Sequence, residues 1–147
     1  MTILSNGDRE YGRIVGSIVW PGNKTGYGVI IGEEKFPEIG TQKYHSYLLA
    51  EIEEKSLDRL LDKYAHQAAK FNVHYFYGRN HQPSLRYLEM WNNERRAKRL
   101  PGLEFYYAPY SDQGNIEFQI NILLNKLSPG NKTLHLGESK IAGYMNI

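Results

Sequence analysis

The chain has 147 residues and a formal net charge of +2, which suits one domain built around one hydrophobic core. Hydrophobic residues make up 41% of it and charged residues 23%, so a disordered chain is excluded. No cysteine is present, which excludes disulfides, thiolate zinc sites and cysteine nucleophiles. Because neither a long apolar span nor a signal peptide is evident, we expect a cytoplasmic protein with no membrane partner.

The first half of the chain predicts an antiparallel meander. Residues 13–20 are rich in β-branched side chains, turn formers follow at 21–26, and residues 27–32 resume the apolar pattern, which is typical of a hairpin. Residues 44–53 have the character of a third strand. Residues 1–11 lack any periodicity, so we expect a flexible arm there.

The second half of the chain alternates helices with short strands. A helix is expected from Leu57 to Phe71 with Ser56 as its N-cap, because its apolar residues recur on one stripe. Pro83 suits the first turn of a second helix, which Pro101 and Gly102 end. The remaining predicted elements are strands at 73–77 and 103–108, a third helix at 116–127 and a short tail over 129–147.

This order predicts an α/β fold for a single domain over residues 1–147. A meander followed by alternating helices and strands gives a mixed five-stranded sheet with helices packed on its faces. The expected fold class is therefore ribonuclease H-like in its succession of elements.

Two local stretches resemble the nuclease domain of the large terminase subunit of tailed phages. In that family the first strand ends in an aspartate before a turn with proline and glycine, and here Trp20 stands before Pro21 and Gly22. The family's fourth strand ends in a carboxylate, an asparagine and a helix that begins with proline, and here Gly78 precedes Asn80 and the expected helix. The resemblance covers most of the chain in element order, but both acids are missing.

The missing acids bear on mechanism. The resemblance implies two divalent cations held between carboxylates, one activating water and the other stabilising the leaving oxygen. Tryptophan and glycine supply no oxygen ligand for Mg²⁺ or Mn²⁺. We therefore expect no cofactor and no catalysis, and the leading hypothesis is a noncatalytic domain of phage DNA packaging that binds double-stranded DNA or a packaging protein.

Relocated acids are the alternative. Glu51 and Glu53 share one face of the third predicted strand and could join Asp112 or Glu138 in an active Mg²⁺- or Mn²⁺-dependent endonuclease. A solvated strand end explains the same glutamates more simply.

Candidate DNA-binding residues are basic side chains and one histidine. A run of cations ends the second predicted helix, where the helix dipole alone would favour them, and arginine also suits phosphate. His81 and its neighbour Arg79 follow a strand of the sheet, where open α/β folds place ligands, although a plain polar turn would look the same. The full set is Lys24, Arg79, His81, Arg95, Arg96, Lys98 and Arg99.

A third hypothesis is a protein-interaction module with no nucleic-acid role. Twelve tyrosines are unusual for this length, and tyrosine is enriched at interfaces. Tyr106, Tyr107 and Tyr110 are the expected anchors of such a surface.

Overall fold

Three long strands form the middle of one mixed sheet. The computed structural model describes residues 11–41, 43–108, 116–127 and 132–136. Strands β1 (Tyr11–Val19), β2 (Gly26–Glu34) and β3 (Tyr44–Glu54) pair antiparallel in chain order. The predicted hairpin is confirmed, and the third strand completes the meander.

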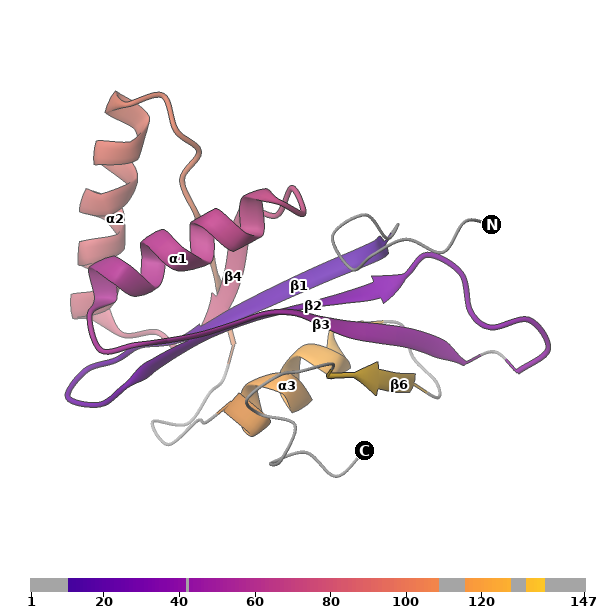
Figure 1. Ribbon diagram of the computed structural model, residues 1–147. Helices are drawn as coiled ribbons and strands as arrows, with labels where there is room; N and C mark the ends of the chain where they lie inside the picture. The colour runs from indigo at the N-terminus through magenta and orange to yellow at the C-terminus, as the bar shows by residue number, and fades with distance from the viewer. Residues whose placement is uncertain (1–10, 42, 109–115, 128–131, 137–147) are drawn as a thin grey trace.

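Three short strands extend the meander on both sides. The sheet has the order β5-β4-β1-β2-β3-β6 (Figure 1). Strand β4 (Tyr75–Gly78) lies parallel beside β1, and β5 (Glu104–Tyr107) lies parallel beside β4. Strand β6 (Lys132–His135) lies parallel beside the first half of β3. The predicted α/β class is confirmed at this level.

The sixth strand corrects the expected sheet of five strands. The sequence predicts only a tail at residues 132–135, because four residues are too few for a clear alternation. In the structure they pair with residues 44–47 of β3, and Leu134 is buried on the same side of the sheet as α3. Tertiary pairing with β3, rather than local propensity, makes this segment a strand.

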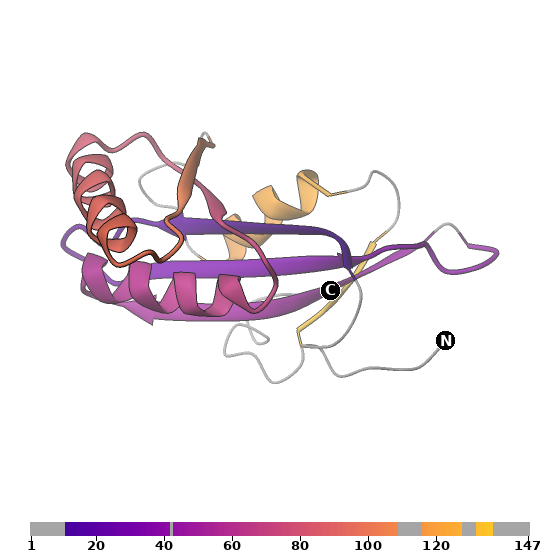
Figure 2. The same cartoon turned by 90° about the horizontal axis from the view of Figure 1, so that it is seen from above.

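Helices cover both faces of the sheet. Helices α1 (Leu57–Ala69) and α2 (Gln82–Ala97) lie on one side, and α3 (Ile116–Asn125) lies on the other (Figures 1 and 2). Two hydrophobic clusters follow from this arrangement. The cluster under α1 and α2 includes Ile18, Ile30 and Phe76, and the one under α3 includes Val29 and Ile120.

Local signals explain where α1 begins and ends. The Ser56 hydroxyl accepts a hydrogen bond from the Arg59 N–H at 3.4 Å, which confirms the predicted N-cap. The helix ends before the expected Phe71, because Asn72 adopts a left-handed conformation with φ 56°. That turn lets the Val73 N–H donate to the Ala68 carbonyl at 3.0 Å, which closes the helix end.

Candidate functional site

The carboxyl ends of β1 and β4 meet, and the Trp20 side chain joins them. Its indole N–H donates to the Arg79 carbonyl at 2.9 Å, and its ring packs edge-on against Phe76 with centroids 5.5 Å apart. Trp20 is buried, and so is Gly78, where an added Cβ would lie 3.3 Å from the Ile18 carbonyl oxygen. The side chain that follows β1 is therefore part of the core.

Three of the predicted DNA-binding residues lie at this end of the sheet. Arg79 is half-buried directly after β4, and His81 occupies the N-cap position of α2. The His81 Nδ1 lies 2.7 Å from the Ser84 hydroxyl, so this ring is held against the first turn of the helix. Lys24 is exposed in the turn between β1 and β2.

The other four predicted residues form a separate group at the far end of α2. This helix has 16 residues, so its two ends lie about 24 Å apart. The basic run of Arg95, Arg96, Lys98 and Arg99 is at its C-terminus. The structure therefore divides the predicted set into two groups instead of bringing it together.

Arg95 differs from the rest of the basic run. Its Nε donates to the Pro101 carbonyl at 2.7 Å, and its guanidinium lies 4.6 Å from the centre of the Trp91 ring. These contacts hold the loop after α2 against the helix, which is a structural role. Arg96, Lys98 and Arg99 are exposed. Only these three cations of the run are presented to solvent for contact with phosphate.

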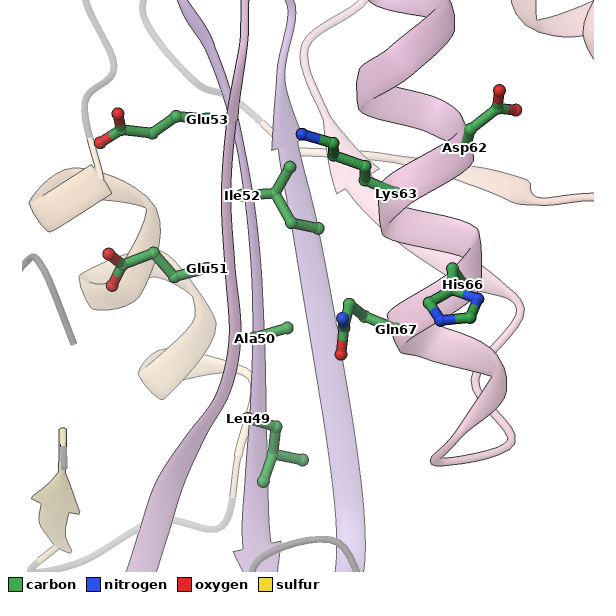
Figure 3. Close-up of a pocket in the computed structure, with 9 residues that line it drawn as sticks. All are labelled: Leu49, Ala50, Glu51, Ile52, Glu53, Asp62, Lys63, His66 and Gln67. Atoms are coloured by element: carbon green, nitrogen blue, oxygen red, sulfur yellow. The ribbon is translucent and has the colours of Figure 1, made fainter. Parts of the chain in front are cut away.

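Glu51 and Glu53 lie on one face of β3, as alternation predicts. Figure 3 shows both side chains pointing away from α1, toward the face that carries α3. Strand β2 separates β3 from β1, which places β3 roughly 10 Å from the first strand. Asp112 and Glu138 lie outside the described residues. Within the described ranges, no three His, Asp or Glu side chains are grouped so that they could hold a metal ion.

A cleft between β3 and α1 was not expected from the sequence. It has a volume of about 670 Å³ and is lined by Leu49–Glu53 of β3 and by Asp62, Lys63, His66 and Gln67 of α1 (Figure 3). Lys63 forms an ion pair of 2.8 Å with Glu54 beside it. The hydrogen bond from Lys63 lowers the pKa of the Glu54 carboxyl. The only feature of the sequence that relates the two walls of this cleft is the short connection of two residues between β3 and α1.

Within the described ranges, the two exposed tyrosines lie on opposite faces of β5. Tyr106 and Tyr107 are 42% and 62% exposed, but they are successive residues of β5 and so point to opposite faces. Tyr106 packs against Tyr75 and Tyr77 on the α3 side, with centroids 5.0 and 5.7 Å apart. Its hydroxyl donates to Glu104 at 2.9 Å, which raises the pKa of Tyr106. Tyr110 lies outside the described residues.

Two histidines that sequence spacing did not connect lie side by side. The His45 Nδ1 and the His135 Nε2 are 2.9 Å apart, and the His45 Nε2 is 3.4 Å from a Glu38 carboxylate oxygen. The contact arises because β6 pairs with β3, which the sequence did not predict. The two histidines are 90 residues apart in the chain, so no local motif could have indicated their contact.

Comparisons with known proteins identify no similar protein. No protein-family model matches the chain, and searches of curated proteins and of solved structures return no similar chain. Of the helices in the described ranges, none combines the length and apolar character that crossing a membrane requires.

Proposed function

We propose that this chain is a noncatalytic, ribonuclease H-like domain that binds the backbone of double-stranded DNA. The arrangement of the first five strands supports the fold assignment. A three-strand antiparallel meander is extended beside β1 by two parallel strands, β4 and β5. Helices from the connections between these strands cover one face. The phage packaging setting, with packaging proteins as further partners, comes from the resemblance alone.

The junction of β1 and β4 is the observation that carries the noncatalytic part of the proposal. A nuclease that resembles terminases would place metal-binding acids at the ends of these two strands. Here the indole of Trp20 fills the core at one end and donates to the Arg79 carbonyl, and Gly78 occupies the other. An aspartate in place of Trp20 would bury an unpaired charge and leave a cavity, so this junction is built for packing.

Exposed cations supply the binding part of the proposal. Arg96, Lys98 and Arg99 project from the C-terminal end of α2, and Lys24 projects from the β1–β2 turn. Contacts to phosphate oxygens give affinity that depends on salt and not on base sequence. A site that uses the three exposed cations of α2 should give a salt slope of about −3, since each phosphate contact contributes about −0.9.

Binding to a short duplex as a function of salt tests the proposal. The double variant Arg96→Ala, Lys98→Ala should weaken binding at about 50 mM salt by roughly tenfold and reduce the slope by about two. The variant Lys55→Ala, Arg59→Ala removes the same charge from the start of α1 and should leave the slope unchanged. Failure of the wild type to bind duplex DNA at low salt contradicts the proposal.

Incubation with supercoiled plasmid tests the absence of catalysis. We expect no nicking with Mg²⁺ or Mn²⁺. Nicking by the wild type that is lost in the double variant Glu51→Ala, Glu53→Ala would instead establish an active nuclease with relocated carboxylates.

A further inference from the structure

Three tyrosines of strands β4 and β5 form a cluster on the face of the sheet that carries α3. The ring centroids of Tyr75, Tyr77 and Tyr106 lie 5.0 to 6.0 Å apart. Tyr77 and Tyr106 are direct partners in the β4–β5 ladder, and paired residues of neighbouring strands point to the same face. The three rings therefore make one aromatic surface, which we call the tyrosine cluster.

The tyrosine cluster is ordered and partly open to solvent. Tyr106 is 42% exposed, and Tyr75 and Tyr77 are half-buried. The Tyr106 hydroxyl donates to Glu104 at 2.9 Å, and the Tyr75 hydroxyl donates to the Ile14 carbonyl. These hydrogen bonds hold two of the rings in place. A ring that is already held loses little conformational entropy when a flat ligand stacks on it.

Two cations border the tyrosine cluster. The Lys126 ammonium, directly after α3, lies 5.0 Å from the centre of the Tyr77 ring. The Arg13 guanidinium donates to the Lys126 carbonyl at 3.5 Å, which brings both basic residues to the same border. Both side chains are exposed. Glu104 also lies at the cluster, where its carboxylate accepts the hydrogen bond from Tyr106.

We propose that the tyrosine cluster binds a single strand of DNA by base stacking, with Arg13 and Lys126 contacting its phosphates. Unpaired bases stack on aromatic side chains, and basic residues beside the rings follow the nucleic-acid backbone. The cluster lies on the opposite side of the sheet from α2 (Figures 1 and 2). This site is therefore independent of the α2 cations that we propose to bind duplex DNA.

The polar groups of the cluster favour DNA over RNA as the ligand. The hydroxyl protons of Tyr75 and Tyr106 are already donated within the protein, so neither hydroxyl can donate to a ribose 2′-hydroxyl. Stacking itself does not depend on the sugar, because it uses the faces of the bases. We therefore expect no gain in affinity when ribose replaces deoxyribose.

Fluorescence anisotropy of a labelled strand of ten thymidines tests the ligand side of the proposal. The wild type should bind this strand at about 50 mM salt. A strand of equal length with abasic spacers keeps every phosphate but lacks the bases, so it should bind about tenfold more weakly. Equal binding of the two strands, or no binding of the thymidine strand, overturns the proposal. A tenfold preference for a strand of ten uridines would overturn the assignment to DNA.

The two exposed tyrosines of β5 provide a matched pair of variants. Tyr106→Ala should weaken binding of the thymidine strand about tenfold, whereas Tyr106→Phe keeps the ring and should bind within about twofold of the wild type. Tyr107→Ala removes an exposed ring from the opposite face of the same strand and should leave the affinity unchanged. Equal affinities of the Tyr106→Ala and Tyr107→Ala proteins overturn the proposal.

The salt dependence of binding tests the phosphate contacts. The double variant Arg13→Ala, Lys126→Ala should reduce the salt slope by about 1.4, since each phosphate contact to a single strand contributes about −0.7. The variant Lys55→Ala, Arg59→Ala removes the same charge from the start of α1 and should leave the slope unchanged. An unchanged slope in the first variant contradicts the assigned contacts.

The α2 variant separates this proposal from the proposed duplex binding. Arg96→Ala, Lys98→Ala should weaken binding of the duplex and leave binding of the thymidine strand unchanged. If this variant weakens both equally, the single strand binds at α2, and the tyrosine cluster is not its site.

Discussion

Replacing Gly16 by alanine should destabilise the protein strongly. Gly16 lies in β1 on the face covered by α1, directly beneath the buried ring of Tyr64. A Cβ added there would overlap the Tyr64 hydroxyl and lie 2.9 Å from the ring carbon that carries it. Since that hydroxyl donates to the Tyr75 carbonyl at 2.8 Å, the ring cannot move aside without losing a hydrogen bond.

The magnitude follows from two costs and one gain. Overpacking a core costs about 1–3 kcal/mol, and a buried polar group left without its partner costs about 1–3 kcal/mol. Alanine is favoured over glycine inside a strand by about 0.5–1 kcal/mol, which offsets part of this. We expect the free energy of unfolding to fall by about 2–4 kcal/mol in Gly16→Ala.

A double-mutant cycle identifies the clash as the cause. Tyr64→Phe removes the hydroxyl and should by itself lower the free energy of unfolding by about 1–2 kcal/mol. In the double variant, the same change should relieve most of the overlap with the added methyl group. The two changes should therefore be less than additive by at least about 1 kcal/mol, measured by urea denaturation with the m-value checked for constancy. Gly78→Ala is the matched control, because the added Cβ would meet no atom closer than 3.3 Å. This substitution should lower the free energy of unfolding by less than about 1 kcal/mol. A Gly16→Ala protein as stable as the wild type, or strictly additive effects, would refute this reasoning.

Three further predictions concern single side chains. Arg99 adopts a left-handed conformation with φ 59° at the end of α2, where glycine is less strained than other residues. Arg99→Gly should therefore raise the free energy of unfolding by about 1 kcal/mol, and Arg99→Ala should not. Equal effects of the two variants in thermal denaturation would contradict this. Trp20→Phe removes the indole N–H that bonds the Arg79 carbonyl, and denaturation should show a loss of about 1–3 kcal/mol. Burial, and then the hydrogen bond to Asp58, raises the pKa of Tyr87 to about 12. Because the pKa of Tyr87 is higher in the folded protein than in the unfolded chain, the protonated hydroxyl stabilises the fold. This contribution is complete below pH 10 and is lost as the pH rises through about 12. Asp58→Asn should lower the Tyr87 pKa, measured by NMR titration of the ring carbon that bears the hydroxyl, and an unchanged pKa would exclude the contribution of Asp58.

Much of the fold was predictable because its signals are local. The β-branched runs on either side of residues 21–26 specify a hairpin, and Ser56 begins α1 through a hydrogen bond within its first turn. Such features depend on neighbours a few residues away. The candidate site was harder to predict from the sequence, because its parts belong to segments that only the folded chain brings together.

The predicted DNA-binding residues illustrate the difference. The sequence supplies the seven predicted side chains. It does not show that Lys24 lies in the β1–β2 turn, that Arg79 and His81 precede α2, and that the basic run lies at the other end of this helix. It also does not show that Arg95 is engaged with Trp91 and Pro101. Local spacing along a helix is fixed by its period, but the separation of two groups depends on helix length and packing.

Periodicity, capping and turn chemistry thus determined the meander and the three helices from the sequence alone, and the sequence itself shows that Trp20 and Gly78 are not acids. Only the tertiary structure decided that residues 132–135 form a sixth strand, that the Trp20 indole joins β1 to β4, and that a cleft lies between β3 and α1. The physical reason is that strand pairing and burial join residues that are distant in the chain. Local propensity biases such pairings weakly, and packing selects among them.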